Sequence, residues 1–192
     1  MKRKVVSYLA VYLSLALILA MMGVVFFFSS EKAEQSSQTS DKVTDMVLTL
    51  FVKDFAQKPE SEKMQLRQSW SHVVRKCAHF LEYFALGFLV YLHLRFLQTF
   101  GKKEQDIRYF GLRVNPDSPL FSISWVLAFA VSLIYACSDE YHQSFIEGRG
   151  PQVLDICIDA SGAATGIFVL WIVWAIIRQV QLKKGKKGNP ES

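Results

Sequence analysis

The chain has 192 residues, of which 51% are hydrophobic and only 20% are charged, and its mean hydropathy of +0.20 is high for a soluble domain. Its net charge of +5 would suit nucleic-acid binding, but the basic residues lie in short clusters beside long apolar runs rather than along a face interleaved with aromatic residues. The composition therefore argues against an ordinary soluble globule and against a nucleic-acid partner, and it indicates a membrane protein.

Four apolar runs are each close to the roughly 20 residues that a helix needs to cross a bilayer. The first runs from Val5 to Phe28 after a basic start. It is longer than the core of a cleavable signal peptide and has no small-x-small cleavage site, so residues 1–28 are predicted to form a retained signal anchor. The expected fold class is all-α, an integral membrane bundle of four transmembrane helices. The other three helices are predicted at about 73–97, 120–137 and 156–177, within a core of residues 73–177.

The distribution of Lys and Arg predicts the orientation of this bundle, because cytoplasmic flanks are enriched in both. Three basic residues precede the first run, four lie between the second and third, and five follow the fourth, whereas the loop between the third and fourth holds only Arg149. We therefore expect both termini to be cytoplasmic, including the basic tail 178–192. Residues 29–72 and 138–152 then face outward, although six basic and seven acidic residues leave the longer loop undecided.

The long outer segment 29–72 divides into three parts. Ser29 to Ser40 is rich in Ser and Gln and predicts a flexible linker. From Val43 onward, apolar residues recur at helical spacing among charged ones, which predicts a helix on the membrane surface that ends before Pro59, with a solvated loop as the alternative. A second polar helix is expected from about Glu60 and runs into the second span.

Ionisable side chains inside the spans are the most informative feature, since each costs at least ~2.5 kcal/mol near the membrane centre and normally faces a cavity or a partner. Such residues follow one helical stripe of the second span, with Glu82 at its margin, and one stripe of the fourth span. Both stripes begin at the outer end, where the third span ends in an acidic segment. The residues expected to converge there on one polar pocket are Lys76, His79, Glu82, Asp139, Glu140, His142, Arg149, Asp155 and Asp159.

Three kinds of chemistry would suit such a pocket. In the first, His79 or His142 is a general acid/base held by Glu82 or Glu140, while cations bind an anionic group such as a lipid phosphate. The candidate binding residues are then Lys76, Tyr83, Gln143, Arg149, Asp155 and Asp159.

The second chemistry is a Zn²⁺ or Mn²⁺ site of imidazoles and carboxylates. Its candidate ligands are His79, Glu82, Glu140, His142, Asp155 and Asp159. No His-Glu-x-x-His helix supports it, and the nearby cations would repel a metal, so the sequence predicts no cofactor. In the third interpretation, the charged side chains only pair with one another and hold the helices of the bundle together.

Several residues have a simpler structural interpretation. Gly162 and Gly166 form a small-xxx-small pattern that lets helices approach closely. Arg75 is expected to snorkel to lipid headgroups, and Asp139 and Glu147 are consistent with simple solvation. The three cysteines form no Cys-x-x-Cys pair and are expected to be buried and inert, although a disulfide on the outer face is chemically allowed. They are Cys77, Cys137 and Cys157.

Three blocks of residues carry a resemblance to a known family. They are Lys76-x-x-His79-Phe80-x-Glu82-Tyr83-x-x-Leu86-Gly87, Ser138-Asp139-Glu140-x-x-Gln143-x-Phe145 with Arg149, and Asp155-x-x-x-Asp159-x-x-Gly162-x-x-x-Gly166. In order and spacing they resemble the VanZ-like family, which commonly has Asn where this chain has Asp159. The resemblance implies a small bacterial multi-spanning membrane protein, from a family named after a member associated with resistance to glycopeptide antibiotics, chiefly teicoplanin.

The function expected from the sequence is an outer-leaflet pocket that binds or modifies an anionic envelope component and so lowers the access or affinity of a lipoglycopeptide drug. The expected partners are membrane lipids or a lipid-linked envelope component. One alternative is a non-enzymatic membrane or interaction protein whose charges are structural. A small transporter is the third, because four spans offer little alternating-access machinery.

Overall fold

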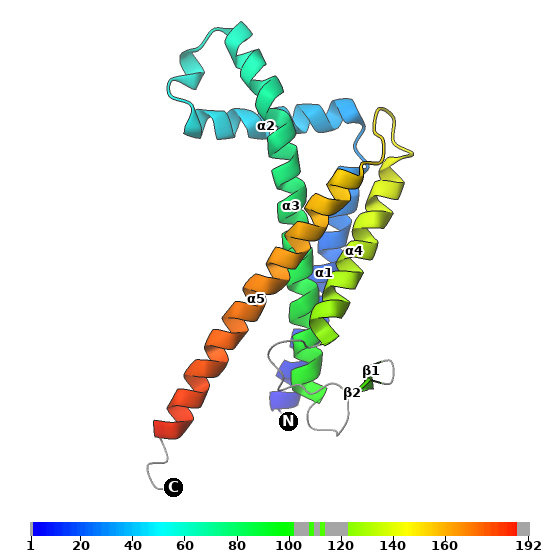
Figure 1. Ribbon diagram of the computed structural model, residues 1–192, viewed down its shortest axis with the longest axis vertical. Coiled ribbons are helices and arrows are strands. Elements are labelled where there is room, and N and C mark those ends of the chain that lie inside the picture. Colours follow the sequence, from blue (N-terminus) through cyan, green and yellow to red (C-terminus); the bar gives the residue numbers. More distant parts are fainter. Residues whose placement is uncertain (1, 102–107, 110–111, 114–122, 188–192) are drawn as a thin grey trace.

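The computed structural model describes residues 2–101, 108–109, 112–113 and 123–187 (Figure 1). They form helices α1 (Lys2–Ser29), α2 (Ala33–Phe51), α3 (Glu60–Gly101), α4 (Ile123–Gln143) and α5 (Val153–Lys187), with a short 3-10 turn η1 (Phe55–Gln57). Two short strands, β1 (Arg108–Tyr109) and β2 (Leu112–Arg113), pair in antiparallel. The predicted all-α class is confirmed. The predicted start of the third span at Leu120, most of the loop 98–119 and the end of the basic tail lie outside the described residues.

Four of the described helices are long and apolar enough to cross a membrane, which confirms the four predicted spans. The segments are Tyr8–Ser29, Glu60–Gln98, Ile123–Gln143 and Val153–Val180. In Figure 1, α1, α3 and α4 lie side by side, and α5 crosses α3 at an angle. Helix α2, the start of α3, the end of α4 and the start of α5 lie together at one end of the bundle, which we call the polar end.

Side chains are distributed over this bundle as a lipid environment requires. Large apolar residues such as Tyr12, Ile134 and Ile176 are more than half exposed on the outside of the helices. The interior combines large apolar residues such as Leu86 and Ile167 with small or polar ones such as Ser132 and Ala136 of α4. All three cysteines are free and exposed, so the expectation that they are buried is wrong.

Three glycines let α3 and α5 pack backbone against backbone. A Cβ atom at Gly162 or Gly166 would overlap a backbone carbonyl of α3, and one at Gly87 would overlap the backbone of Ala163. This confirms the packing role predicted for Gly162 and Gly166. Because both helices start at the polar end, the contact aligns them in parallel and fixes which residues face each other above it.

Helix α2 shows that the predicted flexible linker is wrong from Ala33 onward, because the helix begins there. Ser36, Thr44 and Leu48 form a buried stripe of one helical face, and tertiary packing of this kind overrides a composition rich in Ser and Gln. Arg67 of α3 holds the helix in place by donating from Nε to Asp45 Oδ1 (2.6 Å) and from Nη2 to Oδ2 (2.8 Å). The expected second polar helix is confirmed, since α3 runs without a break from Glu60 into the second span.

The glycine contact leads to a prediction about stability. Gly166→Ala should lower the free energy of unfolding by about 1–3 kcal/mol, because the added methyl group would force α3 and α5 apart. Gly23→Ala is the matched control, since no atom lies within 4 Å of a Cβ at that position of α1, and it should be neutral or slightly stabilising. Thermal unfolding of the two variants in micelles measures the difference, and equal melting temperatures would contradict the contact.

Candidate functional site

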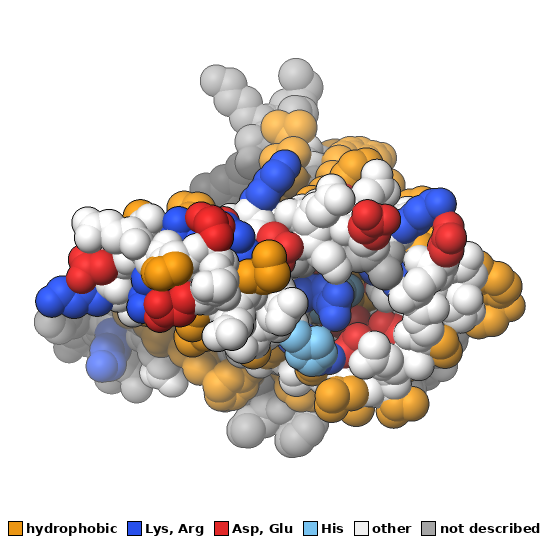
Figure 2. Space-filling view, turned by 90° about the horizontal axis from the view of Figure 1, so that it is seen from above, with side chains coloured by type: hydrophobic (Ala, Val, Ile, Leu, Met, Phe, Trp, Pro, Cys, Tyr) orange, Lys and Arg blue, Asp and Glu red, His pale blue; other side chains and the backbone are white. Residues whose placement is uncertain are grey.

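Charged side chains of both signs gather at the polar end, around a hollow in the surface (Figure 2). The hollow faces along the axis of the bundle, and hydrophobic side chains lie at its outer edge. The contacts of the residues predicted to converge there show which of them lie close together.

The stripes of α3 and α5 face each other through one ion pair and one close approach of an imidazole to a carboxylate. Lys76 donates from Nζ to Asp155 Oδ1, and the side chains of both residues are 19% exposed. One turn deeper, His79 Nδ1 lies 3.7 Å from Asp159 Oδ1. The Asp159 side chain is fully buried, and within the described part of the chain neither of its carboxylate oxygens has a hydrogen-bond partner.

Helix α4 contributes two buried carboxylates to the polar end. Asp139 Oδ2 accepts hydrogen bonds from Ser29 Oγ (2.8 Å) and Gln143 Nε2 (3.1 Å), which ties α1 to α4. Asp139 is only 4% exposed, so the interpretation that it is simply solvated is wrong. Glu140 Oε2 accepts from the backbone N–H of Gln152 at 2.8 Å, which holds the loop 144–152 against the helix.

His142 and Tyr83 lie apart from the contacts between α3 and α5. His142 stacks on Phe26 with ring centroids 4.7 Å apart, and its Nε2 is 3.2 Å from Ser30 Oγ. It points away from Glu140 because α4 continues to Gln143, and residues two apart on an α-helix are about 200° apart. Tyr83 is fully buried beside Tyr135, and its hydroxyl group has no hydrogen-bond partner among the described residues.

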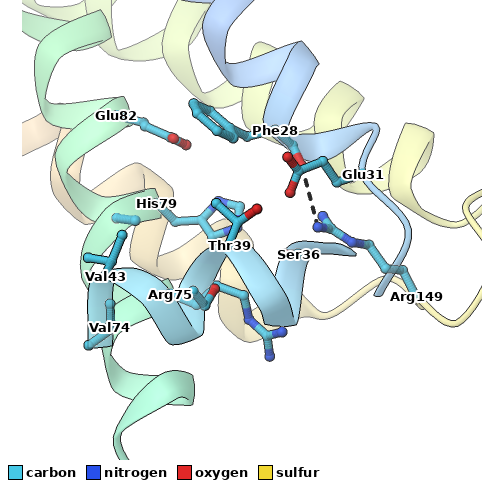
Figure 3. A pocket seen from close by; sticks show the side chains of 12 residues that line it. Phe28, Glu31, Ser36, Thr39, Val43, Val74, Arg75, His79, Glu82 and Arg149 are labelled. Carbon is cyan, nitrogen blue, oxygen red and sulfur yellow. Dashed lines mark hydrogen bonds between the residues drawn. The ribbon is translucent and has the colours of Figure 1, made fainter. Parts of the chain in front are cut away.

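A pocket of about 170 Å³ opens at the polar end between α2, α3 and the end of α1 (Figure 3). Basic, acidic and small polar side chains share its wall. The lining residues are Phe28, Glu31, Ser36, Thr39, Ser40, Val43, Val74, Arg75, Ala78, His79, Glu82 and Arg149. Of the predicted site residues, the pocket thus contains His79, Glu82 and Arg149, whereas Lys76, Glu140 and His142 do not line it.

Arg149 connects the pocket to the end of α1. Its Nη1 donates to the carbonyl oxygen of Ser29 (3.3 Å) and its Nη2 to that of Phe28 (3.4 Å), where a cation is favourable because the last carbonyls of a helix are partly negative. Burial lowers the pKa of the Arg149 guanidinium below its ordinary value, and the positive charge of nearby Arg75 lowers it further. The pocket therefore has two cations that repel each other.

Arg75 is the site residue that the sequence reasoning missed, because it was assigned to lipid headgroups. It lies four residues before His79 and seven before Glu82, so the three side chains share one face of α3 and line the same pocket. The same helical spacing that grouped the other residues of this span therefore contained the signal. Ser36, Thr39 and Ser40 were missed because their segment was interpreted as a linker.

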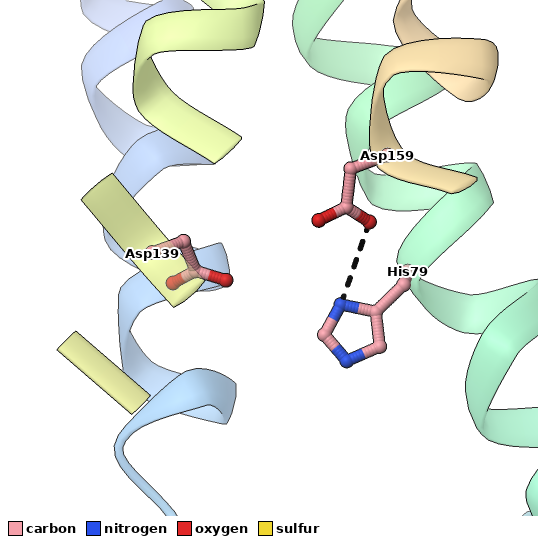
Figure 4. Close-up of side chains that lie close together, drawn as sticks. All are labelled: His79, Asp139 and Asp159. Carbon is pink, nitrogen blue, oxygen red and sulfur yellow. Dashed lines mark ion pairs between the residues drawn. The ribbon is translucent and has the colours of Figure 1, made fainter. Parts of the chain in front are cut away.

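The structure also contains a group of side chains with the geometry of a metal site (Figure 4). Ligand atoms of His79, Asp139 and Asp159 all lie within 4.8 Å of one another. They come from three helices, α3, α4 and α5. This group differs from the metal site considered from the sequence: it shares His79 and Asp159 with that set, and among the described residues Glu82, Glu140, His142 and Asp155 are not part of it.

These features define a class of protein, a multi-pass membrane protein in which residues of the four spanning helices form a charged cluster at one end of the bundle. The sequence profile of the VanZ/LLP1 family matches residues 14–175. Because the match covers most of the chain, the chain belongs to this family, and the resemblance carried by the three motif blocks is confirmed. No curated protein and no solved structure matches the chain.

The contact between α1 and α4 leads to a second prediction. Ser29→Ala should lower the free energy of unfolding by about 1–3 kcal/mol, because it removes a donor from the buried carboxylate of Asp139. Ser144→Ala, just after α4, is the control. Its hydroxyl group bonds the Tyr141 carbonyl in an exposed position, so the change should stay within about 0.5 kcal/mol. Thermal unfolding in micelles compares the two variants. Equal melting temperatures would show that the buried hydrogen bond adds no more to the stability than an exposed one.

Proposed function

We propose that the pocket at the polar end lies in the outer leaflet of a bacterial cell membrane and binds the anionic group of a lipid or of a lipid-linked envelope component. The observation that supports this proposal is that Arg75 and Arg149 line one cavity. Arg149 donates to backbone carbonyls, and within the described residues Arg75 has no ion-pair partner. An anion between the two guanidinium groups would relieve their mutual repulsion, and guanidinium groups contact phosphate in a planar, two-pronged way.

The other wall residues suggest what else the bound group carries. Glu31 and Glu82 accept hydrogen bonds but repel a bare anion, so they favour a phosphate that also bears hydroxyl or amino groups. Ser36, Thr39 and Ser40 of α2 add hydroxyl groups that both donate and accept. The pocket thus suits a polar headgroup better than an isolated phosphate ion.

The size of the pocket limits what it can hold. Sites for drug-sized molecules usually have volumes of about 300–1,000 Å³, and this cavity has about 170 Å³. We therefore propose that the protein acts on a headgroup-sized component of the envelope and not on a whole glycopeptide. Low-level resistance to teicoplanin-type drugs would follow indirectly, because occupying or modifying that component reduces access of the drug to its target.

A catalytic role is the second candidate, and one observation favours it. His79 and Glu82, a candidate acid/base pair from the sequence, both line the cavity, so a bound headgroup would lie within their reach. The alternative of purely structural charges accounts for the Lys76 and Asp155 pair, but it gives no role to Arg75. Gln143 donates to Asp139 and so positions that carboxylate.

A third prediction tests the binding of an anion. Arg75→Gln should weaken the binding of anionic phosphatidylglycerol about ten- to hundredfold, because a charge-assisted contact of about 1.5–3 kcal/mol is lost. Binding to the full chain would be measured in nanodiscs that contain phosphatidylglycerol or the zwitterionic phosphatidylcholine. Lys42→Gln is the matched control, since it removes the same charge from an exposed position of α2 that does not line the pocket.

The expected pattern is a loss of phosphatidylglycerol binding in the Arg75 variant alone, with no change for phosphatidylcholine. Equal weakening in both variants would point to general surface charge and would contradict the pocket. Teicoplanin susceptibility of cells that express each variant extends the test, and protection should fall with Arg75→Gln and persist with Lys42→Gln.

A fourth prediction tests the orientation. In a version in which Cys77, Cys137 and Cys157 are replaced, Glu147→Cys should react with a membrane-impermeant thiol reagent in intact cells, because its side chain is 79% exposed at the polar end. Lys183→Cys, near the end of α5 and also exposed, should react only after permeabilisation. The reverse pattern would place the pocket on the cytoplasmic side and refute the proposed orientation.

A further inference from the structure

We propose that His79, Asp139 and Asp159 bind one divalent transition-metal ion at the polar end of the bundle (Figure 4). Each ligand comes from a different helix, so the ion would join α3, α4 and α5. The proposal is independent of the anion pocket, because the ion requires only these three side chains of the protein.

The distances fit a metal better than they fit direct contacts between the side chains. His79 Nδ1 and Asp159 Oδ1 are 3.7 Å apart, which is too long for a hydrogen bond. Two ligand atoms that each lie about 2.1 Å from a tetrahedral ion are roughly 3.4 Å apart. A small movement of these side chains would therefore place both of them, and an oxygen of Asp139, around one ion.

The state of Asp159 is the second and independent observation. Its side chain is fully buried, and within the described part of the chain both oxygens lack a hydrogen-bond partner. A buried carboxylate without a partner is strongly unfavourable. The nearby Lys76 is already paired with Asp155, and Arg149 donates to the end of α1. A bound cation would satisfy both the charge and the open oxygens of Asp159.

Asp139 is oriented as a metal ligand usually is. Ser29 and Gln143 donate to its Oδ2, so among the described residues its Oδ1 is left without a donor. Outer donors of this kind fix the direction of a carboxylate ligand and are a regular part of metal sites. The buried Glu140, whose Oε1 also has no hydrogen-bond partner in the described chain, lies next to Asp139 in the sequence and adds a further negative charge.

The donor set indicates the kind of ion. One imidazole nitrogen and two carboxylate oxygens suit Zn²⁺ or Mn²⁺, whereas Mg²⁺ and Ca²⁺ prefer oxygen ligands alone. His79 also lines the cavity, which gives an ion a route inward and leaves space for water as a further ligand. Arg75 and Arg149 oppose a cation, but four carboxyl groups at the same end outweigh them: Glu82, Asp139, Glu140 and Asp159.

The test measures metal directly in the full chain, purified in nanodiscs of phosphatidylcholine without a histidine tag. After incubation with Zn²⁺ or Mn²⁺ and removal of the excess, elemental analysis should find about one ion per chain. Asp159→Asn should weaken Zn²⁺ binding at least about tenfold in competition with a chromogenic chelator. Asp54→Asn is the matched control, because it makes the same change at an exposed position outside the group, and it should keep the affinity of the unmodified chain.

His79→Gln, with His142→Gln as its control, repeats the comparison at the imidazole and covers the case in which Asp159→Asn does not fold. Stabilisation provides a further measurement: Zn²⁺ should raise the melting temperature of the unmodified chain, EDTA should reverse the rise, and neither should affect the His79 variant. The proposal is overturned if the unmodified chain takes up no ion, or if the Asp54 and His142 variants lose as much metal as the Asp159 and His79 variants. Because the nanodiscs contain no anionic lipid, a negative result in this metal test does not contradict the anion pocket. A negative result for phosphatidylglycerol binding likewise does not contradict the metal site.

Discussion

The backbone contact between α3 and α5 is the constraint on which the polar end depends. Gly162 and Gly166 face Phe80 and Phe84 with no room for a side chain between the helices, so the two parallel helices can neither slide nor turn without overlap. This register places the residues nearer the polar end opposite one another, and it accounts for the ion pair of Lys76 with Asp155 and for the approach of His79 to Asp159. Two glycines buried deeper in the bundle thus determine which side chains face each other at its polar end.

The buried carboxylates at the polar end lower the stability of the bundle but provide the polar groups of the candidate site. Asp139, Glu140 and Asp159 are each less than 5% exposed, and burying such groups among apolar helices is costly unless they are paired or neutralised. Ser29 and Gln143 donate to Asp139, and the backbone of Gln152 donates to one oxygen of Glu140, whereas Asp159 has no such donor in the described chain. Asp159 lies where α3, α4 and α5 meet, so the site cannot be assigned to one helix alone.

The sequence predicted the features that depend on one helix at a time. Apolar length gave the four spans, and the rotation of about 100° per residue gave the facing stripes that contain His79 and Asp159. The prediction from sequence failed where contacts between distant segments determine the local structure. Helix α2 forms in a Ser-rich segment because Thr44 and Leu48 are buried. A third span that ends at Cys137 leaves His142 and Glu140 in a loop, where both can face one pocket. The helix instead continues to Gln143, so the two side chains point in different directions.

The length of α3 has a mechanical consequence for the pocket. With 42 residues, the helix is roughly 63 Å long at 1.5 Å per residue, about twice the 30 Å thickness of the hydrocarbon core. Its first turns therefore project beyond the core as a rigid lever, and Arg67 fastens α2, one wall of the pocket, to that lever through Asp45. Transmembrane helices adjust to a thicker or thinner bilayer by changing their tilt, so a change in bilayer thickness that tilts α3 would also move α2 relative to the end of α1.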